Sequence, residues 1–220
     1  LNERGIIRIN DQFHQVADYL VQEFFENEAK AKAVNKIVDD LTETLESRTN
    51  KMGLTFAAHI SIKDSELIPL IFDPDILAAI HNFYGRQPFY RNQPMLQINE
   101  YVGEGENNNV DIEGKFHLDG LHQISFMLLL NDITVNDTHM QYALGSNDRV
   151  RVLDSVNRYG YTDDFIKEKY EILDLVGKKG TLYVFDAGAG YHRAVYKSGS
   201  IRKIFHSNFT PGYNLKNDRY

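Results

Sequence analysis

Beyond Gly85 the chain is a succession of short β-type segments, and this pattern constrains the fold more than any other feature of the sequence. The segments are rich in Ile, Val, Phe and Tyr and are separated by Gly, Asn and Asp, a composition typical of strands joined by turns. Many short strands of this kind favour a β-sandwich or jelly roll. The predicted strands are 95–102, 114–118, 123–131, 180–185, 192–196 and 202–209, and the turn-rich connectors are 103–111 and 131–137.

The first third of the chain has helical patterns instead. Apolar residues recur at steps of three and four through 11–28 and again through 29–48, which predicts two amphipathic helices. Asp73 followed by a proline predicts the start of a third helix, and Gly85 predicts its end. A fourth helix is expected over 162–170, with a threonine as its N-cap. These helices would pack on one side of the strands.

Length and composition limit the classes of protein that fit. The 220 residues suit one domain, 1–220, in which we expect a mostly helical support region (1–85) and a jelly-roll core (86–220). A net charge of −7 argues against a general nucleic-acid binder. The apolar runs are too short to cross a bilayer and the chain does not open on a signal-peptide pattern, so we expect a cytoplasmic protein without a membrane partner. Because cysteine is absent, any metal must rest on histidine and carboxylate.

Two histidines and one aspartate form a candidate metal site. His117 and Asp119 are two residues apart in a predicted strand, so their side chains should share one face. His192 follows far along the chain, after a glycine-rich bend and at the start of another strand. Two histidines with one carboxylate make the triad that is typical of non-haem Fe(II) oxygenases. Arg202 lies on the next predicted strand, and its planar guanidinium suits a carboxylate partner.

The order of these residues resembles the Fe(II)/2-oxoglutarate-dependent oxygenases, and within them the phytanoyl-CoA dioxygenase-like family. Segments 136–147, 180–186 and 201–209 carry the closer resemblance, which extends over roughly 97–211. The resemblance implies a cupin-like jelly roll, or double-stranded β-helix, with helices before it. It implies Fe(II), 2-oxoglutarate as co-substrate, and O2. The implied iron ligands and catalytic residues are His117, Asp119 and His192, and the implied co-substrate residues are Arg202, Gln97 and Asn99.

The implied reaction is hydroxylation of an unactivated C–H bond of a small-molecule metabolite, with release of succinate and CO2. Related halogenases have Gly or Ala where this chain has Asp119, so the carboxylate favours hydroxylation. Two positions depart from the family pattern. Ala194 replaces a serine that often contacts the co-substrate, and Asn147 ends a segment that usually ends in histidine.

Two other functions fit the same residues. One is a cupin-like barrel that binds a metal or small ligand without turnover, and the other is a non-oxidative metal-dependent enzyme, such as an isomerase, on the same barrel. Arg202 argues against the first, because simple metal binding needs no carboxylate partner. His122 and His139 flank the predicted site, and Arg193 fits either an anionic substrate or a charged surface. Residues 176–220 carry eight Lys and Arg against two Asp and Glu, which favours entry of a dicarboxylate there.

Overall fold

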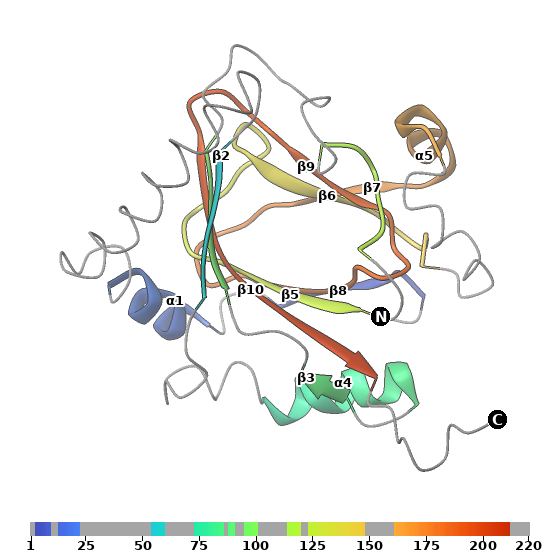
Figure 1. Ribbon diagram of the computed structural model, residues 1–220, viewed down its shortest axis with the longest axis horizontal. Coiled ribbons are helices and arrows are strands. Elements are labelled where there is room, and N and C mark those ends of the chain that lie inside the picture. Colours follow the sequence, from blue (N-terminus) through green and yellow to red (C-terminus); the bar gives the residue numbers. More distant parts are fainter. Residues whose placement is uncertain are drawn as a thin grey trace.

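The computed structural model describes residues 3–9, 13–22, 54–59, 73–85, 88–90, 95–100, 114–119, 123–147 and 161–211. Within them two antiparallel sheets face each other (Figure 1). The larger sheet has the order β1-β8-β5-β10-β4-β2, with β3 paired to β10, and the smaller has the order β7-β6-β9. The predicted jelly-roll class is confirmed. The strands are β1 (Ile6–Ile9), β2 (Leu54–His59), β3 (Pro88–Tyr90), β4 (Met95–Glu100), β5 (Ile124–Leu129), β6 (His139–Ala143), β7 (Ile172–Leu175), β8 (Leu182–Asp186), β9 (His192–Val195) and β10 (Ile201–Pro211).

The central strands of the larger sheet are buried on both faces because each face packs against a different layer. Side chains on the outer face meet α1 (His14–Val21) and α4 (Pro74–Tyr84), which lie on that side of the sheet in Figure 1. Side chains on the inner face meet the smaller sheet. Because successive side chains of a strand point to opposite faces, every second residue of these strands faces the interior of the barrel. The inner apolar residues are Met127, Leu129, Tyr183, Phe185, Ile204 and, from the smaller sheet, Tyr142 and Leu175.

The predicted helix boundaries at 73–85 and 162–170 are confirmed by their caps. The Asp73 carboxylate accepts hydrogen bonds from the first-turn amides of α4, and Gly85 ends that helix with φ of 67°. The hydroxyl of Thr162 accepts from Phe165 N at the start of α5 (Asp163–Lys169). α1 lies inside the predicted helix 11–28. The helix expected at 29–48 and the connector at 103–111 lie outside the described residues.

The prediction of a strand at 114–118 is wrong. This segment is irregular and forms a single bridge, between His117 and His192. β1 and β2 were not predicted: they belong to the region expected to be helical and form the two opposite edges of the larger sheet. β3, β6 and β7 were not predicted either. Within the described ranges, no helix is long and apolar enough to span a membrane.

Candidate metal centre

His117 and His192 are opposite partners in an isolated antiparallel bridge. His117 N donates to His192 O at 3.0 Å, and His192 N donates to His117 O at 3.1 Å. Residues that exchange both hydrogen bonds project their side chains to the same face. The ring centroids are accordingly 4.6 Å apart, and both side chains are buried. One bridge therefore brings together two histidines from distant parts of the chain.

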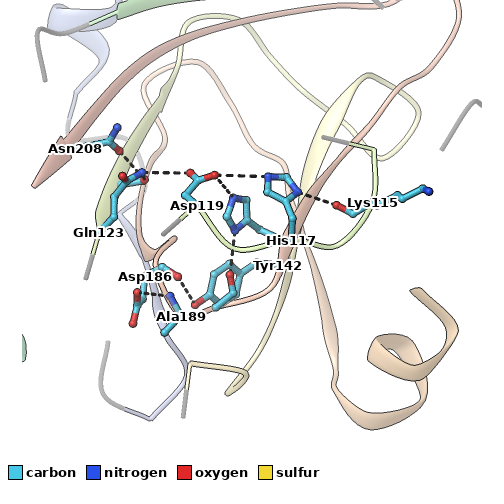
Figure 2. A network of polar contacts seen from close by, with 11 residues as sticks. Lys115, His117, Asp119, Gln123, Tyr142, Asp186, Ala189 and Asn208 are labelled. Carbon is cyan, nitrogen blue, oxygen red and sulfur yellow. Dashed lines mark hydrogen bonds and ion pairs between the residues drawn. The ribbon is translucent and has the colours of Figure 1, made fainter. Parts of the chain in front are cut away.

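Backbone carbonyls fix the tautomers of both rings. Nδ1 of His117 donates to Lys115 O at 2.8 Å (Figure 2), and Nδ1 of His192 donates to Gly190 O at 3.0 Å. A carbonyl oxygen only accepts, so each Nδ1 carries the hydrogen. In the neutral ring Nε2 is then the atom with a free lone pair, which is the arrangement found in metal-bound histidines.

Asp119 completes the group from the irregular segment after His117. Its backbone N donates to Ala187 O at 2.9 Å, and its Oδ1 lies 3.6 Å from Nε2 of each histidine. The three candidate ligand atoms, one from each side chain, all lie within 4.8 Å of one another. Three acceptors that face one another need a positive charge between them, either protons on Nε2 or a metal ion. This donor set of two imidazoles and one carboxylate fits Fe(II).

The charge state of Asp119 suits the same role. Burial by itself raises the pKa of this carboxyl, but His192 and His117 outweigh it when their Nε2 atoms carry the protons that take the place of a metal ion. The pKa of Asp119 therefore lies well below its usual range. The side chain is an anion at neutral pH and would offset part of a bound metal's charge.

The second oxygen of the Asp119 carboxylate has a partner that the sequence analysis did not identify. Gln123 Nε2 donates to Oδ2 at 3.2 Å and lies 3.5 Å from Ser125 Oγ, which donates to Asn208 Oδ1 at 2.7 Å. Figure 2 shows Gln123 between Asp119 and Asn208. A signal was present in the sequence, because positions 123 and 125 are four and two residues before inward-facing Met127 of β5 and share its face.

The Tyr142 side chain packs against the bend (187–191) that precedes His192. The Tyr142 hydroxyl donates to Asp186 O at 3.2 Å, and the Asp186 carboxylate accepts from Ala189 N at 3.0 Å (Figure 2). A Cβ atom on Gly190 would overlap the Tyr142 side chain, so only glycine fits at that position. The glycine-rich sequence of the bend therefore reflects close packing beneath His192.

Arg202 lies on the inner face of β10, directly opposite Asn99 of β4. Its Nε and Nη2 donate to Asn99 Oδ1 at 2.9 and 2.7 Å, and both side chains are buried. This acceptor is a neutral amide oxygen. Gln97 pairs with Ile204 in the same register and is partly buried. The three residues that the resemblance assigns to the co-substrate thus share one wall of the barrel.

His206 lies on the same inner face of β10, two residues beyond Ile204. Burial lowers the pKa of His206 to about 4; the charge of Asp119 opposes this, and the charges of Arg202 and His192 add to it. At neutral pH the His206 side chain is therefore an uncharged imidazole, and its pKa responds to the charges of both Asp119 and Arg202. No role for His206 was predicted from the sequence.

Arg193 and His139 occupy the outer face of the smaller sheet. Arg193 Nη1 pairs with Asp163 of α5 at 2.6 Å, its Nε donates to Gln141 Oε1 at 2.8 Å, and it is buried. His139 contacts Asp174 Oδ1 at 3.0 Å. Arg193 is therefore a buried ion-pair residue rather than an anion site or a surface charge, and His139 does not reach the triad. His122 lies outside the described residues.

Comparison with known proteins identifies the fold. No family model matches the chain, and no curated protein matches it. Among solved structures, apo EctD from S. alaskensis is 15% identical over 95% of this chain and 74% of its own, with a TM-score of 0.56. ThoJ, a non-heme monooxygenase solved as a nickel complex, is 18% identical over 96% and 75%, with a TM-score of 0.55.

A further similar structure is SnoK, a non-heme alpha-ketoglutarate-dependent carbocyclase from nogalamycin biosynthesis. It is 15% identical, over 95% of this chain and 81% of SnoK, with a TM-score of 0.53. At these identities the likeness establishes the fold, a cupin-like jelly roll with flanking helices. EctD has also been solved with iron and with 2-oxoglutarate and 5-hydroxyectoine.

Proposed function

We propose that this protein is an Fe(II)- and 2-oxoglutarate-dependent dioxygenase that hydroxylates an unactivated C–H bond of a small-molecule metabolite. The reaction releases succinate and CO2, and the protein is a cytoplasmic member of the phytanoyl-CoA dioxygenase-like family. The observation that carries the proposal is the convergence of His117 Nε2, His192 Nε2 and Asp119 Oδ1, three acceptors within one metal ion's reach. This fold is shared with structures that are named for the same co-substrate or contain it.

In this proposal His117, Asp119 and His192 hold the iron, which supplies oxidative chemistry with O2 when bound. The backbone carbonyls behind the histidines keep each Nε2 lone pair directed at the metal. The ionised Asp119 lowers the net charge of the site. Two imidazoles and one carboxylate leave positions open for co-substrate and O2.

Arg202 binds the distal carboxylate of 2-oxoglutarate. Arg202 is buried on the inner face of β10, and Asn99 Oδ1 accepts hydrogen bonds from its Nε and Nη2. A carboxylate pairs with the plane of a guanidinium through two parallel charge-assisted hydrogen bonds. Asn99 fixes the orientation of that plane, and Gln97 offers a further polar contact on the same wall.

The test is anaerobic titration of the metal-free protein with Fe(II) and then 2-oxoglutarate. We expect the visible charge-transfer band of the iron chelate, followed by one succinate per 2-oxoglutarate after O2 is admitted with substrate. Metal binding without the band would favour the barrel that binds without turnover or the non-oxidative metal enzyme. Absence of both the band and succinate refutes the oxygenase proposal.

The reaction outcome needs its own experiment, because the structurally similar SnoK is a carbocyclase. A panel of amino acids and acyl thioesters is screened for substrate-dependent succinate release, and products are analysed by mass spectrometry under 18O2. Hydroxylation predicts one labelled oxygen in the product. A product without the label would keep the oxygenase class and contradict hydroxylation.

A further inference from the structure

The two oxygens of the Asp119 carboxylate face different partners. Oδ1 lies 3.6 Å from Nε2 of each histidine, whereas Oδ2 accepts a hydrogen bond from Gln123 Nε2 at 3.2 Å. Figure 2 shows Gln123 on the side of Asp119 away from His117. Rotation of the carboxylate towards the metal position would break the contact with Gln123.

We propose that Gln123 is a positioning residue that holds Asp119 as a one-oxygen metal ligand. This inference rests on the proposed function only in requiring that a metal binds the triad. A carboxylate that turns both oxygens to a metal occupies a position that two histidines and one oxygen leave open. Because Gln123 holds Oδ2 in a hydrogen bond away from the metal, that coordination position stays available for co-substrate, substrate or O2.

Ser125 and Asn208 determine which end of the Gln123 amide faces Asp119. Ser125 Oγ donates its hydrogen to Asn208 Oδ1 at 2.7 Å, so its lone pairs are left for Gln123 Nε2 at 3.5 Å. A flipped amide would present an oxygen to both Ser125 Oγ and Asp119 Oδ2. All three side chains of this relay are buried, where an unsatisfied amide is costly. The relay is therefore a fixed support rather than a chance surface contact.

The test uses Mn(II) as the probe in the metal-stripped full chain, with Gln123→Met as the variant. Methionine is similar in size and cannot donate a hydrogen bond. We expect a loss of Mn(II) affinity of about 10-fold to 100-fold, the usual effect of removing such a support. Water-proton relaxation of the saturated protein should show the metal-bound waters falling from about three to about two, because Asp119 turns both oxygens to the metal.

Gln141→Met is the matched control, because Gln141 makes partly buried hydrogen bonds on the outer face of the smaller sheet. It should leave the water number unchanged even if stability falls. A folded Gln123→Met protein with wild-type affinity and water number overturns the inference. If that variant fails to fold, Ser125→Ala decides: a lower water number supports the relay, and no change overturns it. A wild-type chain that binds no Mn(II) refutes the metal site itself, which is a distinct outcome.

Discussion

Replacement of His206 should remove a loss of stability of about 3 kcal/mol that the wild-type protein suffers between pH 6.5 and pH 4. Burial lowers the pKa of His206 from its ordinary value of 6.5 to about 4. Above pH 6.5 the side chain is neutral in both folded and unfolded protein. Between pH 6.5 and 4 the unfolded chain binds a proton that the folded protein excludes, so stability falls as the pH falls. The slope is about 1.4 kcal/mol per pH unit, which gives a loss of about 3 kcal/mol by pH 4.

The assay is urea unfolding of EDTA-treated protein, followed by circular dichroism at intervals from pH 7 to pH 4. His206→Gln keeps a polar side chain of similar size and removes the titrating group. The free energy of unfolding of the variant minus that of the wild type should be constant above pH 6.5 and rise by about 3 kcal/mol towards pH 4. Other histidines titrate in both proteins and cancel in this difference. Parallel curves over the whole range would refute the placement of a neutral histidine inside the barrel.

Three further changes test other parts of the site. Asp119→Ala should abolish succinate formation with substrate, because the metal loses its anionic ligand; full activity would refute the assigned ligand set. Asn99→Leu removes two hydrogen bonds to Arg202 and should weaken 2-oxoglutarate binding about tenfold, as measured by titration of the charge-transfer band. An unchanged affinity for 2-oxoglutarate would mean that Asn99 is not needed to orient the Arg202 guanidinium. Gly190→Ala should cost about 3 kcal/mol in urea unfolding by overlap with Tyr142, and a variant of wild-type stability would contradict the packing beneath His192.

The parts of the fold that were predictable from sequence are those set by local rules. Asp73 caps the start of α4 and the left-handed Gly85 ends it, and both signals, with the apolar stripe between them, are local in the sequence. Strands β4, β5, β8 and β10 were predictable because each contains several apolar or β-branched residues and is bounded by turn-forming residues. The edge strand β1 was not, because four residues form a strand only when β8 is there to pair with them.

The candidate site divides in the same way. The spacing of His117 and Asp119 led to the correct expectation that both side chains face one way, although the reason was wrong: the segment is held by one bridge and not by a strand. Gln123 is only four residues from Asp119, but its link to Asn208 runs through Ser125 and the pairing of β5 with β10, which are neighbours only in the folded sheet. Contacts of this kind depend on register, and a single sequence does not contain the register.

The excess of basic residues in 176–220 is interpreted differently once the fold is known. The basic segment after residue 175 was expected to attract a dicarboxylate, but three of its charges are paired with acids from the earlier part of the chain: Arg193 with Asp163, Lys178 with Asp132, and Lys179 with Asp18. The Arg193 pair is largely buried and joins β9 to α5, whereas the two lysine pairs are exposed and contribute little to stability. Arg202 is buried, and the oxygen of Asn99 accepts hydrogen bonds from its Nε and Nη2. In the function proposed above, the attraction for 2-oxoglutarate is therefore assigned to this guanidinium rather than to the net charge of the segment.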